Sequence, residues 1–370
     1  MLIQLLTLIN IFAKLEVVRG AVLKLDVRST LMPPYGNGLF HILLAEGGQK
    51  IYALVDTGSD SFFLNWKDWF DRVSEVPCLN WPMGCYKCLE PCSPGAVTKT
   101  VIFEDDQMVK YFQHKATLTL GPVSQAFIFG LTFDQEPPVA EEAAISVMGF
   151  HKDKGDVNFP SLMKQLQSSQ TINNNIFAIY LFPPADHEDP STEGALLLGG
   201  GDPALYQHPL QYVKLTSESH YYVNAVDLQV GDASSTIEVN MDVRLDTGAN
   251  YFSIPEAHYD RLMKEIKAHT SNAAGVDVHF EPDGDIWLMP CEYLAKLPPL
   301  RFGLGSKGAP VHFTITYMNY AENYYGTCYL VVERGNAENI ITFPDRMLIG
   351  NYFQFEPDRV GLSKLASSSA

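Results

Sequence analysis

The sequence predicts a mainly β protein built from two similar halves, and three observations point to this class. The tripeptide Asp-Thr-Gly occurs twice, at residues 56–58 and 246–248, each time after a short apolar run. Gly and Pro, with 27 and 23 copies, are typical of many short strands joined by turns. Long helical patterns are scarce, and 370 residues are enough for two domains of similar size.

Each Asp-Thr-Gly lies where a strand-like segment breaks into a tight turn. The first copy follows the apolar run 51–55 and the second follows 241–245, and each leads into another apolar run. Glycine supplies the backbone freedom that such a turn needs. One copy alone is an ordinary turn, but two copies with matching flanks indicate two halves that bring two carboxylates together.

Two segments are the best candidates for helices. Residues 160–166 form the first, and residues 255–267 form the second. The second begins with Pro255 and Glu256, and a proline followed by an acid is typical of a helix start.

Taken together, these residues resemble the pepsin-like aspartic proteases, over about residues 35–365. The resemblance implies a mainly β, bilobal pepsin-like acid protease fold, with two pseudo-symmetric antiparallel β lobes and an active-site cleft between them. In that family each lobe threads an apolar-apolar-Gly strand past its catalytic loop. We match these strands to 147–149 and 348–350, and further similarity lies in 128–131, 198–200 and 355–362.

The resemblance also divides the chain. Residues 35–202 are expected to form the N-terminal lobe and residues 203–370 the C-terminal lobe, after a short prosegment-like or N-terminal strand region at 21–34. Residues 1–20 are predicted to be a signal peptide. Their apolar run is shorter than the roughly 20 residues that span a bilayer, and the alternative is a buried first strand.

Charge and cysteine content indicate the compartment and the partners. A net charge of −17 argues against nucleic acid or an anionic membrane as partner, and no other segment predicts a membrane span. Six cysteines fit an oxidising environment. We therefore expect a monomer that is secreted or held in an acidic endomembrane compartment such as a lysosome or vacuole.

By resemblance, Cys291 pairs with Cys328 in a disulfide of the second lobe. The other four cysteines predict either two disulfides, with three possible pairings, or a four-thiolate zinc site. Disulfides are favoured, because only one Cys-x-x-Cys pair exists and acid protonates thiolates. No metal and no cofactor are expected. These four cysteines are Cys78, Cys85, Cys88 and Cys92.

The predicted chemistry comes from two adjacent carboxylates, Asp56 and Asp246. Such a pair shares one proton, so it takes a proton from a held water while donating one to a peptide carbonyl. This predicts an aspartic endopeptidase acting on polypeptides. By resemblance, the threonines brace the two turns and Ser59 bonds the Asp56 carboxylate. The loop-supporting residues are Thr57, Gly58, Ser59, Thr247 and Gly248.

Three positions depart from the family pattern. The family covers its substrate with a Gly-rich hairpin that carries a tyrosine, supported by a tryptophan. Residues 101–107 lack that tyrosine and those glycines; Phe103 is the nearest counterpart and Tyr111 a second candidate. Phe63 stands at the tryptophan position, and Ala249 replaces the usual Ser or Thr.

The same hairpin carries an acidic cluster at residues 104–106 that begins with Glu104. If the cluster faces the cleft, it is expected to disfavour acidic peptides; the alternative is a solvated turn.

These departures leave a second function open. The alternative to the enzyme is a catalytically weak or inactive pepsin-like protein that acts as a peptide- or protein-binding module. A carbohydrase is less favoured, because the matched patterns belong to proteases. The presence of both Asp-Thr-Gly copies favours the enzyme over the binding module.

Overall fold

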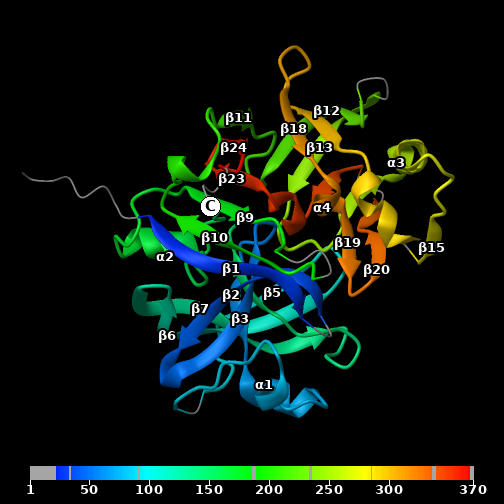
Figure 1. The fold of residues 1–370 in the computed structure, drawn as a ribbon. Coiled ribbons are helices and arrows are strands. Elements are labelled where there is room, and N and C mark those ends of the chain that lie inside the picture. Colours follow the sequence, from blue (N-terminus) through cyan, green and yellow to red (C-terminus); the bar gives the residue numbers. More distant parts are fainter. Residues whose placement is uncertain are drawn as a thin grey trace, which may run out of the picture.

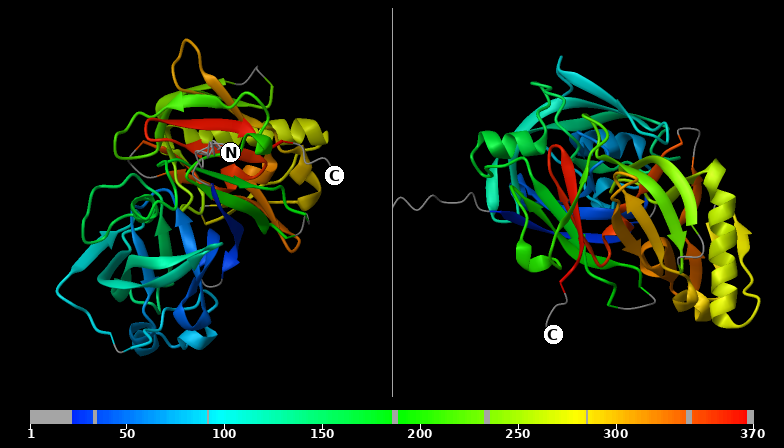
Figure 2. Two further views of the ribbon diagram at one scale, coloured as in Figure 1. Left: turned by 90° about the vertical axis from the view of Figure 1, so that its left-hand side faces the viewer. Right: turned by 90° about the horizontal axis from the view of Figure 1, so that it is seen from above.

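A computed structural model describes residues 22–32, 35–90, 92–185, 189–232, 236–284, 286–335 and 339–366. The predicted signal peptide lies outside these residues. Two lobes are visible, one built mainly from the first half of the chain and one from the second (Figures 1 and 2). No helix in this described part of the chain is long and apolar enough to cross a membrane.

A 13-stranded sheet runs through the N-terminal lobe and continues into the contact between the lobes. Its middle strands come from both ends of the chain, because β1 pairs with β2 and β10 while β23 pairs with β9. In sheet order the strands are β11 (Gln211–Lys214), β24 (Arg359–Lys364), β23 (Asn351–Phe355), β9 (Phe177–Leu181), β10 (Thr192–Leu198), β1 (Leu23–Met32), β2 (Gly36–Ala45), β3 (Gln49–Asp56), β8 (Ser146–Gly149), β4 (Phe62–Asn65), β7 (Val123–Glu136), β6 (Met108–Leu120) and β5 (Thr98–Ile102).

Two further sheets form the C-terminal lobe. The 7-stranded sheet is ordered β18 (Val311–Ile315), β17 (Leu300–Leu304), β12 (Tyr222–Val230), β13 (Thr236–Leu245), β22 (Ile341–Phe343), β14 (Phe252–Pro255) and β21 (Val332–Gly335). The 4-stranded sheet is ordered β15 (Glu281–Asp283), β16 (Ile286–Met289), β20 (Thr327–Leu330) and β19 (Ala321–Tyr324).

The two lobes repeat one strand-pairing pattern around the Asp-Thr-Gly turns. In the first lobe β3 runs parallel to β8, β8 antiparallel to β4, and β4 parallel to β7. In the second lobe β13, β22, β14 and β21 follow the same sequence of directions. The predicted bilobal, mainly β fold is therefore confirmed, and its pseudo-symmetry extends to individual strand pairs. The predicted lobe boundary falls after β10 and stays a prediction.

One predicted strand match was wrong. The C-terminal counterpart of β8 is β22, at residues 341–343, and not 348–350. The sequence search looked for two apolar residues followed by a glycine. It did not find β22, because Pro344 stands directly after this strand. Residues 345–348 instead form a 3-10 turn.

Both predicted helices are confirmed, with shifted ends. The helix α2 (Leu162–Ser168) begins after Ser161, whose hydroxyl accepts the N–H of Lys164 at 3.3 Å. The helix α3 (Glu256–Ala274) continues beyond the predicted end to Gly275, which closes it with a φ of 70°. Two short helices, α1 (Lys67–Val73) and α4 (Tyr317–Tyr320), were not predicted.

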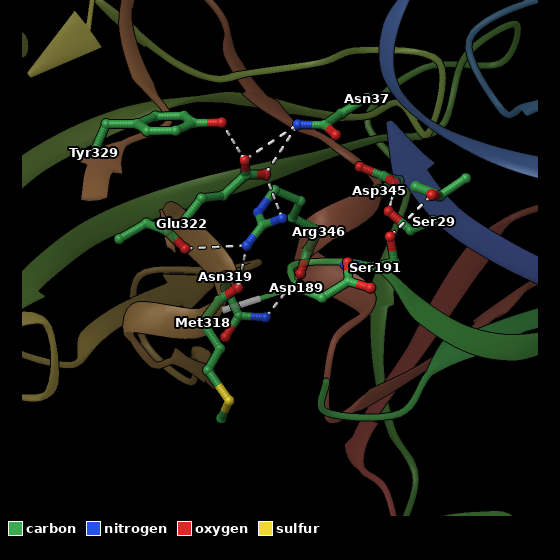
Figure 3. A network of polar contacts seen from close by, with 12 residues as sticks. Ser29, Asn37, Asp189, Ser191, Met318, Asn319, Glu322, Tyr329, Asp345 and Arg346 are labelled. Carbon is green, nitrogen blue, oxygen red and sulfur yellow. Dashed lines mark hydrogen bonds and ion pairs between the residues drawn. The ribbon is translucent and has the colours of Figure 1, made fainter. Parts of the chain in front are cut away.

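A buried polar network ties the first strands of the chain to the C-terminal lobe (Figure 3). Ser29 on β1 donates its hydroxyl to the Asp345 carboxylate at 2.6 Å. Asn37 on β2 donates to Glu322, which also forms a buried ion pair with Arg346. Burial raises the pKa of the Asp345 carboxyl to about 6, although the Ser29 hydrogen bond and the Arg346 charge lower it.

This raised pKa predicts how Asp345 contributes to stability. The folded state holds the Asp345 proton to about pH 6, whereas the unfolded chain releases it near the ordinary carboxyl pKa of 3.8. The contribution is therefore complete below about pH 4 and is lost as the pH rises to about 6. Between pH 3 and 7 the wild type should lose about 3 kcal/mol of unfolding free energy relative to Asp345→Asn, measured by chemical denaturation.

The control is Asp68→Asn, at an exposed position on α1. It should follow the wild-type pH dependence. If Asp345→Asn also follows the wild-type curve, the Asp345 carboxyl does not hold its proton in the folded state.

Candidate active site

The two Asp-Thr-Gly turns meet at one cleft of about 850 Å³ that is lined by both lobes. Asp56 is the last residue of β3, and Asp246 follows directly after β13. Strand order explains the meeting, because β3 and β13 occupy equivalent places in the two lobes. At the cleft Asp56 is buried and Asp246 is half-buried.

The two turns are locked together by reciprocal hydrogen bonds between their threonines. The Thr57 hydroxyl accepts the N–H of Thr247 at 3.0 Å and donates to the carbonyl of Leu245 at 2.7 Å. The Thr247 hydroxyl accepts the N–H of Thr57 at 3.1 Å and donates to the carbonyl of Val55 at 2.6 Å. Each buried hydroxyl thus acts as donor and acceptor, which fixes the two turns against each other.

The glycines hold the carboxylates and leave room for them. The N–H of Gly58 donates to Asp56 Oδ1 at 2.7 Å, and that of Gly248 donates to Asp246 Oδ1 at 2.9 Å. A Cβ at Gly58 would lie 2.4 Å from Asp246 Oδ2, and one at Gly248 would lie 2.7 Å from Asp56 Oδ1. Any side chain at either glycine would therefore push the two carboxyls apart.

The environment favours a proton on this pair. Burial, followed by the charge of Asp246, raises the pKa of Asp56 well above its ordinary value. Burial also raises the pKa of Asp246, against the opposing effects of the Gly248 N–H and the Arg244 charge. A hydrogen bond joins the two carboxyl groups. Two such groups cannot both ionise cheaply, so they titrate as a unit that retains one proton.

The comparison with known proteins agrees with this geometry. Residues 42–365 match the family model described as eukaryotic aspartyl protease. The chain belongs to this family. It is 24% identical to a renin of Echis ocellatus over 185 residues, 50% of this chain and 43% of that protein. It is 28% identical to cathepsin D of Rattus norvegicus over 156 residues, 42% of this chain and 33% of that protein. The chain thus spans about a third to a half of the length of these relatives.

The predicted family contacts beside the aspartates are formed partly by the backbone. Ser59 donates its N–H to the Asp56 carboxylate, while its hydroxyl accepts the N–H of Ser61 at 3.0 Å. The bond from the Ser59 hydroxyl to Asp56 stays a prediction. Ala249 also donates its N–H to the Asp246 carboxylate, but it has no hydroxyl to add.

Phe103, Phe63 and Tyr111 form an aromatic group at the predicted hairpin. Phe103 lies in the turn between β5 and β6 and lines the cleft. The Phe103 ring lies 6.4 Å from that of Phe63, and the Tyr111 ring stacks on Phe63 at 5.1 Å. The Tyr111 hydroxyl bonds Ser61 at 3.3 Å and is buried below the hairpin. No hydroxyl stands at the Phe103 position, so the hairpin presents an apolar ring to the cleft, and its role as a cover over the substrate stays a prediction.

The main cleft residue missed from the sequence is Arg244, two residues before Asp246. Its side chain is 7% exposed and forms an ion pair with Glu104 of the hairpin, which is 57% exposed. The signal was present in the sequence: an arginine stands within the apolar run that precedes the second Asp-Thr-Gly. Glu104 thus lines the cleft, as the hypothesis that the acidic cluster disfavours acidic peptides required. Its negative charge is balanced, however, by the positive charge of Arg244.

The cysteines form three disulfides. Cys291 bonds Cys328 in the second lobe. Of the pairings left open by the sequence, the structure has Cys78 with Cys85 and Cys88 with Cys92. Cys88 and Cys92 also approach His114 within 4.8 Å, the only such group of potential metal ligands among the described residues. Their sulfurs are bonded to each other, so they offer no thiolate to a metal.

The missing hydroxyl at Ala249 predicts a shift in working pH. A Thr hydroxyl donated to the Asp246 carboxylate would favour the ionised form and lower the pKa of the pair. Ala249→Thr should therefore move the pH-rate profile to lower pH by about one unit or less, the effect of one hydrogen bond. Ala249→Val is the matched control, because it adds similar bulk without a donor. Equal profiles for the two variants would show that the hydroxyl does not set the working pH.

Proposed function

We propose that this protein is an aspartic endopeptidase in which Asp56 and Asp246 together activate water. The observation that carries the proposal is the hydrogen-bonded pair of carboxyls, one buried and one half-buried, in a cleft between the lobes. The raised pKa of both groups supports a shared proton, which the reaction needs. Membership of the aspartyl protease family supports a peptide bond as the target.

In the proposed reaction, water is held between the two carboxyls. The ionised carboxyl takes a proton from this water as it attacks the scissile carbonyl carbon, while the protonated carboxyl donates to the carbonyl oxygen. A tetrahedral diol results, with no covalent bond to the enzyme. The C–N bond of the diol then breaks as one carboxyl donates a proton to the leaving nitrogen and the other takes a proton from a diol hydroxyl, which completes hydrolysis and restores the monoprotonated pair. The Gly58 and Gly248 N–H groups hold the carboxyls in place throughout.

We further propose that the substrates are polypeptides and that the protein acts as a monomer, secreted or in an acidic endomembrane compartment. Three disulfides support a route through an oxidising environment. The raised pKa of the carboxyl pair supports work at acid pH. The proposed lobes are residues 35–202 and 203–370, with 21–34 as a prosegment-like or N-terminal strand region and 1–20 as a signal peptide.

A second candidate, a peptide-binding module with little catalysis, is favoured by one observation. Phe103 supplies no hydroxyl at the hairpin, so the cover cannot donate a hydrogen bond from this position to the bound peptide. A loss of this kind lowers the rate more than the affinity, because it acts on the orientation of the substrate in the transition state.

The test is hydrolysis of denatured globin from pH 3 to 7, with and without pepstatin. The wild type should cleave at acid pH and be inhibited, and Asp56→Asn or Asp246→Asn should lower turnover by at least about 1,000-fold without changing the fold. Asp68→Asn on α1 should retain activity. Turnover by pure Asp56→Asn would contradict the assignment, whereas peptide binding without cleavage by the wild type would favour the binding module.

A further inference from the structure

Tyr111 is a buried tyrosine on β6 whose hydroxyl points toward the first Asp-Thr-Gly turn. It is 1% exposed, and its hydroxyl donates to the Ser61 hydroxyl at 3.3 Å. Among the described residues, Ser61 lines the cleft and Tyr111 lies behind it. Burial raises the pKa of the Tyr111 hydroxyl, although the bond to Ser61 lowers it, so the group stays protonated and remains a donor at any working pH.

The surroundings of Tyr111 fix the direction of its hydroxyl. Its ring stacks on Phe63 at 5.1 Å and meets the Phe159 ring edge-to-face at 5.1 Å. A Cβ at Gly130 would lie 2.2 Å from the Tyr111 ring, so the glycine leaves room for it. The register of β6 against β7 shifts between Lys110 and Tyr111, and such a bulge re-aims the side chain next to it. Ring packing, the missing Cβ and the bulge together hold the hydroxyl toward Ser61.

Ser61 connects this hydroxyl to Asp56 by two routes. In the first, the Ser61 N–H donates to the Ser59 hydroxyl at 3.0 Å, and the Ser59 N–H donates to the Asp56 carboxylate. In the second, the Ser61 carbonyl accepts the N–H of Gly149 at 2.7 Å. The next residue, Phe150, donates its N–H to the Asp56 carbonyl at 2.7 Å. Both the carboxylate and the backbone of Asp56 therefore depend on where Ser61 lies.

The ring contacts alone do not require a tyrosine at this position. A phenylalanine would pack on Phe63 and Phe159 equally well and would avoid the cost of burying a hydroxyl. The hydroxyl is the part of Tyr111 that reaches the Asp56 turn, through Ser61. Because a buried hydroxyl is costly to leave without a partner, this bond favours one position of the turn over others.

We propose that Tyr111 is a positioning residue that fixes the Asp56 turn through its hydrogen bond to Ser61. This inference rests on the proposed endopeptidase function and adds a residue that touches neither the substrate nor the reacting atoms. The Asp56 carboxyl must lie within hydrogen-bond reach of both the water and Asp246, and a small misplacement of such a group lowers the rate. The bond acts on the carboxyl pair and not on contacts with the peptide, so it should affect kcat more than KM.

Tyr111→Phe tests the hydroxyl alone, because the ring stays. With a peptide substrate at the pH of greatest activity, kcat should fall about 10-fold at nearly unchanged KM, the effect of one buried hydrogen bond. Tyr86→Phe is the matched control: Tyr86 is also 1% exposed, and its hydroxyl lies 3.2 Å from His114 Nε2, away from the cleft. It should keep the wild-type kcat. A Tyr111→Phe variant that unfolds more easily but keeps the wild-type kcat would overturn the proposal, because the bond would then be structural only.

A double-mutant cycle assigns the effect to Ser61. Ser61→Ala should lower kcat about as much as Tyr111→Phe does. The double variant should fall no further, because both changes remove the same hydrogen bond. Losses that multiply in the double variant would show that Tyr111 does not act through Ser61, which would also overturn the proposal.

A titration separates this inference from the proposed function. Carbon-13 NMR of the carboxyl groups follows the protonation of the Asp56–Asp246 pair without any turnover. In Tyr111→Phe the Ser59 N–H should hold the ionised Asp56 carboxylate less firmly, so the apparent pKa of the pair should rise by about half a unit. If the wild type cleaves no peptide, the endopeptidase proposal fails and this titration alone decides the inference. Equal titration curves for Tyr111→Phe and the wild type would contradict it.

Discussion

The reciprocal hydrogen bonds between Thr57 and Thr247 are the constraint on which the rest of the cleft depends. They place two buried turns from different lobes back to back, so that the following glycines must lack side chains. The carboxylates at the heads of the turns are then forced together and share a hydrogen bond. The order of the strands helps to bring the two turns together, because β3 lies beside β8 in one lobe as β13 lies beside β22 in the other. The pseudo-symmetry of the fold is thus what positions the candidate chemistry.

Burial also links stability and the proposed chemistry to acid pH. The pKa values of Asp56, Asp246 and Asp345 are all raised, with burial as the first cause. The folded chain therefore holds protons that the unfolded chain releases, so acid pH favours folding, and two of these three groups, Asp56 and Asp246, form the pair that shares a proton in the proposed reaction. Asp345 lies in the network that joins the first strands to the C-terminal lobe (Figure 3). An acidic compartment would thus suit both the fold and the cleft.

Local patterns predicted much of the fold, and features set by long-range contacts were harder to predict. The two Asp-Thr-Gly turns and α3 carry their own signals, namely apolar strands before a glycine turn and a proline before an acid. By contrast, β22 ends at Phe343 and is followed by Pro344, so a search for a glycine at that position did not find the strand. The pairing of the four clustered cysteines depends on how α1 and its neighbouring segments fold. The spacing of the cysteines along the sequence does not determine it. The role of Arg244 was missed because its partner Glu104 comes from the other lobe.

The central claim is that Asp56 and Asp246 share one proton, and neutron diffraction tests it most directly. Crystals exchanged into heavy water at the pH of greatest activity would reveal the deuterium between or on the two carboxyl groups. The account predicts one deuterium for the pair, held in the hydrogen bond that joins the carboxyls. A pair with no deuterium, or with one on each carboxyl pointing away from the other, would contradict it.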